Sequence, residues 1–163
     1  MILFSSALEL IVNKNNKMNN LVIDATRNEI FLTLINNKTT YTSTYENSKN
    51  NFEKLVMLIS EFLKNNKISI NEISQIYVNR GPGSFAGIRN SLSIVKGYNL
   101  SKNIDYFCFS FLDFIKLDNI EKKKIAKNLS LLNKFHNIKY KDIPNLCHKF
   151  KIKKNLIKPI YLS

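Results

Sequence analysis

The stretch NRGPGSFAGIRN (79–90) decides the fold, because it joins a strand pattern to a helix pattern through a glycine-rich turn. Together with Gly97 it holds all four glycines of the 163-residue chain. The run ISQIYV (73–78) before it is typical of a strand, and apolar residues recur at helical spacing from Phe85 to about Ser101. Backbone N–H groups at the start of such a helix are free to face an anion or another segment, so this turn is the first candidate for a site.

Two phosphate-binding motifs share this strand–turn–helix geometry. The spacing of the glycines and of the charged residues tests each of them. A Walker A loop has four residues between its glycines and then Lys-Ser or Lys-Thr, whereas Gly83 and Gly87 enclose three and no lysine follows. The dinucleotide pattern is formally met by Gly81, Gly83 and Ala86, but Asp105 begins the next strand instead of ending it. Both phosphate interpretations are therefore disfavoured.

A purely structural interpretation of the turn stays open. Gly81 and Gly83 would allow a positive φ on either side of the rigid Pro82, and Ser84 would cap the helix. Gly87 would let a neighbouring backbone approach closely. In this interpretation the turn binds no ligand.

The chain up to Leu117 predicts an α/β fold. The first three strands would form a meander with the third on an edge of the sheet, and an amphipathic helix would follow them. The expected elements are strands at 20–26, 29–35, 38–45, 73–78 and 104–109, and helices at about 49–65, 85–101 and 110–117. The order β-β-β-α-β-α-β-α is that of the ribonuclease H-like fold of the actin, hexokinase and Hsp70 ATPase superfamily, with a mixed five-stranded sheet.

Charge divides the chain into a nearly balanced body and a basic tail. Residues 119–163 contain twelve lysines but only two acidic residues, which accounts for most of the net charge of +13. We therefore expect a domain at 18–117 and a short lysine-rich C-terminal appendage at 118–163. Residues 1–17 are expected to be an N-terminal extension, because Met18 opens a cleaner strand pattern.

Hydropathy and cysteine usage indicate the compartment. No stretch reaches the ~20 apolar residues that a membrane-spanning helix requires, so we expect no membrane association. Cys108 and Cys147 lack the spacing of a metal or redox site, and such sparse usage suits a reducing environment. The expected location is the cytoplasm.

Three motifs carry a resemblance to a known family. VNRGPGSFAGIRNSLSIVKGYNL (78–100) resembles the signature of the bacterial tRNA threonylcarbamoyladenosine biosynthesis protein TsaB (YeaZ) family. LVIDATRNEIFLTL (21–34) is similar to the opening strands of that family through Asp24 and the turn after it, and KPIYL (158–162) is similar to its closing Pro-x-Tyr-Leu. The chain thus resembles a shortened member, in which a second ribonuclease H-like lobe is reduced to the basic appendage.

The resemblance implies a non-catalytic subunit of the machinery that adds a threonylcarbamoyl group to the adenosine beside the tRNA anticodon. The implied partners are a TsaD-like transferase, which the subunit binds and supports, a TsaE-like ATPase, and tRNA through the complex. The resemblance also implies a homodimer when the subunit is alone. It implies that the subunit holds no cofactor of its own and that ATP binds only at an interface of the complex.

The residues themselves offer little catalytic chemistry. His136 and His148 are twelve positions apart and do not form the helical pair that shares a metal ion, so we expect no metal site. Ser84 and Cys108 have no base near them in the sequence, so we expect no catalytic residue. Asp24 ends the first strand, where ATP-using relatives of the fold keep a metal-binding acid, and is a candidate vestigial nucleotide site. The alternative function is therefore a small ATP-binding enzyme of the sugar-kinase/actin superfamily, using Asp24 and the glycine turn.

The helix after the turn carries small residues every four positions, in two rows. One row is Gly87, Ser91 and Val95, and the other is Ser93 and Gly97. Small side chains let another helix pack closely, either a partner's helix or one from the chain's own fold. With the resemblance, the first row and the helix at 49–65 become the expected TsaD-binding surface, and Arg89 would pin the loop or reach a partner carboxylate. The motif and expected interface together comprise Gly81, Pro82, Gly83, Ser84, Phe85, Gly87, Arg89, Ser91, Val95 and Gly97.

The lysine-rich appendage has two interpretations. Its lysines would attract phosphate groups regardless of base sequence, and EKKKIAKNLSLLNKF (121–135) can form a basic amphipathic helix, which indicates contact with tRNA. Alternatively, it is a solvated face whose lysine content follows from AT-rich coding. The sequence leaves both interpretations open.

Overall fold

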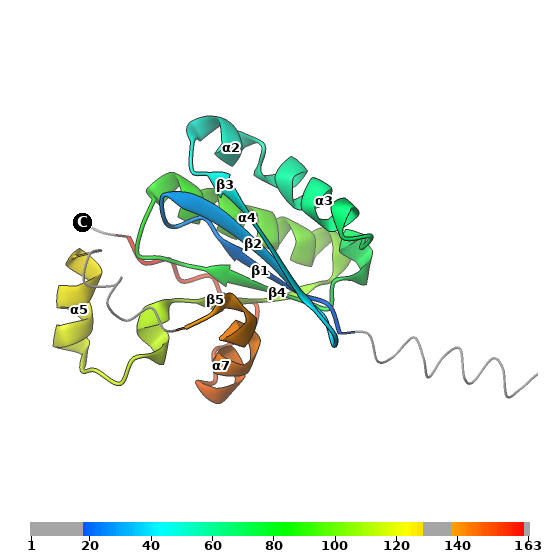
Figure 1. Ribbon diagram of the computed structural model, residues 1–163. Coiled ribbons are helices and arrows are strands. Elements are labelled where there is room, and N and C mark those ends of the chain that lie inside the picture. Colours follow the sequence, from blue (N-terminus) through cyan, green and yellow to red (C-terminus); the bar gives the residue numbers. More distant parts are fainter. Residues whose placement is uncertain (1–17, 129–137, 162–163) are drawn as a thin grey trace, which may run out of the picture.

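A computed structural model of the chain describes residues 18–128 and 138–161 (Figure 1). Its strands are β1 (Asn20–Asp24), β2 (Glu29–Ile35), β3 (Thr40–Glu46), β4 (Gln75–Asn79) and β5 (Asp105–Phe109). They form one sheet in the order β3-β2-β1-β4-β5. The β1–β2 and β2–β3 pairs are antiparallel, whereas the β1–β4 and β4–β5 pairs are parallel. The predicted mixed five-stranded sheet is therefore confirmed, and β3 lies on an edge as expected.

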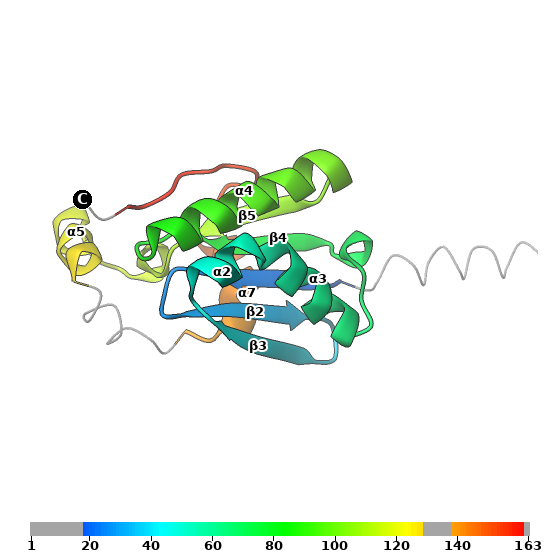
Figure 2. The same ribbon diagram turned by 90° about the horizontal axis from the view of Figure 1, so that it is seen from above.

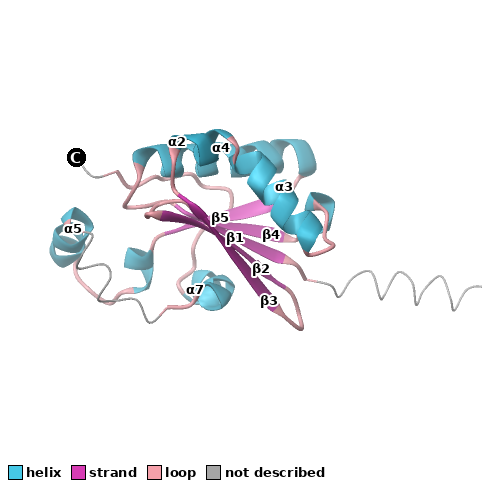
Figure 3. Cartoon of the chain, turned by 45° about the horizontal axis from the view of Figure 1, so that its top comes forward, coloured by secondary structure: helices cyan, strands magenta, loops and turns pink. Residues whose placement is uncertain are grey.

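Helices lie on both sides of this sheet (Figures 2 and 3). The helices on one face are α2 (Lys49–Glu53), α3 (Leu55–Asn65) and α4 (Phe85–Lys102), and those on the other side are α5 (Asn119–Lys127) and α7 (Ile143–Lys149). Three short 3-10 turns connect the elements: η1 (Ile70–Glu72), η2 (Phe111–Phe114) and η3 (Tyr140–Asp142). Within the described ranges, no helix is both long and apolar enough to cross a membrane.

The helix predicted at about 49–65 is divided into α2 and α3, which meet at Lys54. The side-chain amide of Asn51 in α2 donates to the carbonyl of Glu46 over 2.6 Å. This bond ties α2 to the end of β3, whereas α3 follows the apolar core through Leu55 and Ile59, which are fully buried. The prediction of one continuous helix was wrong, because the backbone leaves helical geometry at Lys54, with φ −97° and ψ 6°.

The helix predicted at 110–117 is only the single turn η2. Ser110 and Asp113 form a reciprocal capping box around it, and the chain is extended again at Ile115, with φ −99° and ψ 129°. Farther along, α5 ends at Lys127, and the remainder of the helix predicted at 121–135 falls on residues 129–135, outside the described residues.

Side chains alternate between two cores, one on each face of the sheet. In β1, Leu21 and Ile23 belong to the core beneath α3 and α4, whereas Val22 belongs to the core on the opposite face. That second core includes Ile125 of α5 and Ile143 and Cys147 of α7. The described part of the lysine-rich segment thus covers one face of the sheet, while the domain boundary at 117 stays a prediction.

Residues 154–161, here called the C-terminal strap, return along β5 and α4 (Figure 2). Lys154 forms an isolated antiparallel bridge with Phe107, and the backbone N–H of Asn155 donates to Tyr106 over 2.7 Å. Farther along, the N–H of Ile160 donates to the carbonyl of Arg80 over 2.8 Å. The strap therefore ends beside the glycine-rich turn.

Candidate functional site

The glycine-rich turn is shaped by close backbone contacts. Gly81 has a φ of +104°, and a Cβ there would overlap the carbonyl oxygen of Ile160 and lie 2.8 Å from Cδ1 of Ile88. A Cβ at Gly83 would overlap the carbonyl of Thr26. Both glycines are thus required where the turn meets the loop after β1 and the C-terminal strap, so the turn touches both the first and the last motif of the sequence.

Ser84 begins α4 as the sequence predicted. Its Oγ accepts a hydrogen bond from the N–H of Gly87 over 3.2 Å, and its own N–H donates to the carbonyl of Thr26 over 2.8 Å. One of the free N–H groups of the first helical turn is therefore satisfied within the chain.

Asp24 lies at the end of β1 and is completely buried. Its Oδ1 accepts from the backbone N–H and the hydroxyl of Thr26, over 3.0 and 2.7 Å. Its Oδ2 accepts from the side-chain amide of Asn79, over 2.9 Å, and from the hydroxyl of Tyr140, over 2.8 Å. Arg27 adds an ion pair at 3.9 Å. We call Asp24, Thr26, Asn79 and Tyr140 the Asp24 cluster.

Aromatic rings close the Asp24 cluster from the side of η3. The ring of Tyr140 lies 5.2 Å from that of Phe31 and 6.2 Å from that of Phe111, and the Arg27 guanidinium lies over Phe111 at 4.9 Å. Burial, followed by the negative charge of Asp24, raises the pKa of the Tyr140 phenol well above its ordinary value of 10.0. Tyr140 therefore remains a neutral donor to the carboxylate at physiological pH.

The Asp24 cluster has a chemical consequence for the expected nucleotide site. Four donors occupy the two carboxylate oxygens, so an incoming metal ion would have to displace Tyr140 or Asn79. Asn79 also accepts the N–H of Gly81 over 3.0 Å, which links the carboxylate to the glycine turn. Both oxygens of Asp24 are thus bonded within the chain, and a vestigial nucleotide site there stays a prediction.

Sequence reasoning missed three residues of this region: Asn79, Arg80 and Tyr140. Arg80 pairs with Asp113 over 2.6 Å and donates from its other terminal nitrogen to the carbonyl of Lys158 over 2.9 Å. Asn79 and Arg80 directly precede the glycines, so their position was a usable signal. No sequence signal marked Tyr140, because its contact with Asp24 spans 116 positions.

The first small-residue row requires a correction. Gly87, Ser91 and Val95 are buried, the last two completely, and face the chain's own sheet and neighbouring helices. They cannot form an exposed partner surface, because the side of α4 that carries them is the side that covers the core. Of the predicted interface, Phe85, Arg89 and Gly97 are exposed, and a Cβ at Gly97 would meet only open space. Of the turn residues, Pro82 is buried.

A groove of about 620 Å³ runs along α3 and the segment after it and reaches Tyr98 of α4, and Val56 and Ser60 are among its α3 residues. The same two helices carry large apolar side chains that face solvent: Met57 of α3 is 67% exposed and Leu100 of α4 is 75% exposed. We call Val56 and Met57 of α3 with Ser93, Gly97 and Leu100 of α4 the outer helical face.

Other candidate groups are inert or outside the described residues. Cys108 and Cys147 are free and buried, and burial raises the pKa of each thiol to about 12, so neither is an activated nucleophile. His148 is exposed, whereas His136 lies outside the described residues. Over the ranges 18–128 and 138–161, no group of three or more His, Cys, Asp or Glu side chains could hold a metal ion.

Comparison with known proteins gives the chain's relatives. The family model described as TsaD, tRNA N6-adenosine threonylcarbamoyltransferase, matches residues 21–132. Two proteins of Buchnera aphidicola, from the subspecies Baizongia pistaciae and Schizaphis graminum, are each named tRNA threonylcarbamoyladenosine biosynthesis protein TsaB. They are 29% and 27% identical to the chain over 113 residues, which is 69% of the chain and 51% and 54% of the relatives. The chain thus spans about half the length of the curated relatives it matches.

Solved structures confirm the predicted fold. YeaZ from Pseudomonas aeruginosa superposes with a TM-score of 0.54 at 15% identity, over 69% of this chain and 50% of that one. A second structure, of an uncharacterized protein with similarity to peptidase YEAZ from the same organism, gives 0.55 at 18% identity, over 60% and 45%. The fold is therefore the ribonuclease H-like one, and the predicted resemblance to TsaB is confirmed by the named relatives. The family model covers well over half of the chain's length. The chain therefore belongs to the family of TsaD, tRNA N6-adenosine threonylcarbamoyltransferase.

Proposed function

We propose that the chain is a non-catalytic subunit of the tRNA threonylcarbamoyladenosine machinery, which binds and supports a TsaD-like transferase. Relatives named for this biosynthesis support the pathway. In this proposal a TsaE-like ATPase joins the pair, and tRNA is reached through the complex. The chain itself holds no cofactor, and ATP enters only at an interface of the complex.

The observation that best supports a non-catalytic role is the Asp24 cluster, in which both carboxylate oxygens are already hydrogen-bonded. A phosphoryl-transfer site needs a carboxylate that can reach a metal ion, but Asp24 is fully buried and bonded on both oxygens. Opening it would break the contact that Tyr140 makes from the far end of the chain. The geometry therefore disfavours the alternative, a small ATP-binding enzyme of the sugar-kinase/actin superfamily.

The partner surface that we propose is the outer helical face. Val56 and Met57 are 49% and 67% exposed on α3, and Leu100 is 75% exposed on α4. Ser93 and Gly97 form the second small-residue row, which is exposed and leaves room for another helix against α4. Exposed apolar side chains beside a groove are typical of protein–protein contacts.

The test is co-expression of the full chain with the TsaD-type transferase of the same genome, followed by size-exclusion chromatography and a tRNA modification assay. We expect a stable complex that modifies tRNA, and no ATP hydrolysis by the chain alone. The double substitution Val56→Glu with Gly97→Leu should abolish the complex without unfolding the chain, because both positions are exposed.

The matched control is Ile120→Glu, which alters an apolar residue that is 67% exposed on α5, away from the outer helical face. It should leave the complex intact. Undiminished complex with the double variant would show that the partner surface is elsewhere. ATP hydrolysis by the isolated chain would overturn the non-catalytic assignment.

A further inference from the structure

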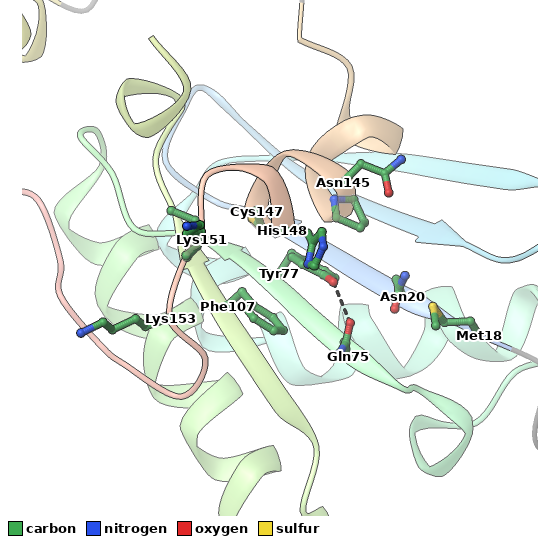
Figure 4. Close-up of a pocket in the computed structure, with 12 residues that line it drawn as sticks. Met18, Asn20, Gln75, Tyr77, Phe107, Asn145, Cys147, His148, Lys151 and Lys153 are labelled. Carbon is green, nitrogen blue, oxygen red and sulfur yellow. Dashed lines mark hydrogen bonds between the residues drawn. The ribbon is translucent and has the colours of Figure 1, made fainter. Parts of the chain in front are cut away.

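A second concave site, shown in Figure 4, lies at the opposite end of the parallel strands from the glycine turn. It is a pocket of about 560 Å³ between α7 with the segment after it and the amino-terminal ends of the parallel strands. Gln75, the first residue of β4, lines it, whereas Asn79, the last residue of β4, belongs to the Asp24 cluster. The pocket is therefore separate from the site described above, and its volume is in the range of small-molecule sites.

The floor of the pocket combines two aromatic rings with the side-chain amide of Gln75. The rings of Tyr77 and Phe107 are stacked, with centroids 5.1 Å apart and planes inclined by 12°. The Tyr77 hydroxyl donates to Oε1 of Gln75 over 2.7 Å, which fixes the amide and directs its NH₂ group away from that bond. In Figure 4, Asn20 and Gln75 project from strands on one side, and His148 comes from α7 on the other.

Asn20 carries an unsatisfied polar atom at this pocket. The residue lines the pocket and is only 7% exposed, yet its Oδ1 has no hydrogen-bond partner among the residues that the structure describes. A buried carbonyl oxygen without a donor is costly, so a ligand N–H presented from the pocket would stabilise it.

The electrostatics of the pocket favour an anion. His148, Lys151 and Lys153 line it, and none of the described lining residues is acidic. Tyr77 and Cys147 also line it, and both stay protonated at neutral pH because burial raises the pKa of each to about 12. The described lining residues therefore contribute positive charge and no negative charge to the pocket.

We propose that this pocket binds a nucleotide, with the base among Asn20, Gln75 and Phe107 and the phosphate at Lys151 and Lys153. A base offers ring and exocyclic N–H groups for amide side chains and a flat face for an aromatic ring, and its phosphate matches the lysines. The proposal is independent of the partner surface on α3 and α4. It covers a free nucleotide and a nucleotide within an RNA strand, which share this chemistry.

The test is titration of the full ¹⁵N-labelled chain with AMP, followed by NMR, with adenosine and ribose 5-phosphate as partial probes. AMP should shift the resonances of Asn20, Gln75 and His148, and each partial probe should bind about tenfold more weakly, because base and phosphate each contribute about 1.4 kcal/mol. A short single-stranded oligoadenylate is the second arm. Tighter binding of the oligomer through the same resonances assigns the site to RNA, and tighter binding of AMP assigns it to a free nucleotide.

Two matched double variants distinguish binding in the pocket from nonspecific attraction to positive charge. Lys151→Ala with Lys153→Ala should weaken AMP binding about tenfold. Lys38→Ala with Lys102→Ala removes the same charge from exposed positions outside the pocket and should leave the affinity unchanged. Equal weakening by both pairs, ribose 5-phosphate binding as tightly as AMP, or no shift at the pocket residues would overturn the proposal.

Discussion

The hydroxyl of Tyr140 lies 2.8 Å from Oδ2 of Asp24, although 116 positions separate the two residues. The bond joins the end of the first strand to the lysine-rich segment that covers the sheet from the other side. It places a long-range structural contact on the carboxylate that the sequence marked as a candidate nucleotide site. The stability of the chain should therefore depend on that one hydroxyl.

Tyr140→Phe removes a donor from a buried carboxylate and leaves the ring contacts in place. We expect a loss of about 1–3 kcal/mol in the free energy of unfolding, measured by urea denaturation. Tyr41→Phe is the control, because Tyr41 is 43% exposed on the edge strand and should change stability by less than about 0.5 kcal/mol. Equal, small effects of the two substitutions would show that the Tyr140 hydroxyl contributes nothing to the fold.

Stability should fall at alkaline pH because of the two buried thiols. The pKa of Cys108 and of Cys147 is raised from 9.0 to about 12. Below pH 9 the thiols are protonated in both the folded and the unfolded chain, so their contribution is complete. Between pH 9 and 12 the unfolded chain loses these protons first, and each thiol lowers the unfolding free energy by about 1.4 kcal/mol per pH unit.

Urea titrations from pH 7 to pH 11 measure this slope. The double variant Cys108→Ala with Cys147→Ala should show a shallower decline above pH 9 than the unsubstituted chain, even though it is less stable at pH 7. Parallel declines would indicate that the thiols ionise equally in the folded and unfolded chains.

Two glycines should respond to alanine with opposite signs. Gly81→Ala places a Cβ against the Ile160 carbonyl at a φ of +104°, so we expect a loss of about 1–3 kcal/mol. Gly97→Ala adds a methyl group to open space on a helix and should stabilise the chain by about 0.5–1 kcal/mol. Thermal unfolding of the two variants checks the signs, and a stabilising Gly81→Ala would refute the contact with the strap.

Arg80 should hold the C-terminal strap in place. Arg80→Ala removes the pair with Asp113 and the bond to Lys158, in a site where both paired side chains are largely buried. We expect trypsin to cut the strap about tenfold faster in this variant, read by mass spectrometry, as local opening becomes easier by about 1.4 kcal/mol. Lys64→Ala, which removes an exposed cation from α3, should leave the rate unchanged. Identical digestion of both variants would place the anchoring elsewhere.

The lysines of α5 test the RNA interpretation of the basic segment. Replacing Lys123, Lys124 and Lys127, all exposed, by alanine should weaken tRNA binding by the assembled complex, most strongly at low salt, because fewer counterions are released. A filter-binding series over salt concentration measures the slope. An unchanged slope would assign these lysines to a solvated face.

The sheet and the helix after the turn could be predicted from the sequence because their signals are local. The runs NLVID and EIFLTLI are rich in strand-forming residues, and the observed bounds of β1 and β2 lie within the predicted ones. Ser84 was recognisable as the start of α4 from its place after the glycines. The strand that carries Cys108 lies within the predicted range 104–109.

The remainder depended on contacts between distant segments. The row of Gly87, Ser91 and Val95 was visible, but which side of a helix meets the sheet is set by packing, and these residues lie inside. The bond between Arg80 and the strap spans 78 positions, and that between Tyr140 and Asp24 spans 116, so no local pattern marks either one. The closed state of the Asp24 cluster was therefore beyond sequence reasoning, although Asp24 itself was found.

The distance along the chain between Asp24 and Tyr140 also governs the order in which the protein can fold during translation. A ribosome releases all five strands before it releases η3 and α7. Until then the nascent sheet has one face covered by α3 and α4 and the other face covered only in part, with a buried carboxylate that lacks one of its four donors. Folding of this chain can thus begin from its amino-terminal half, but it is completed only when its last quarter has been synthesised.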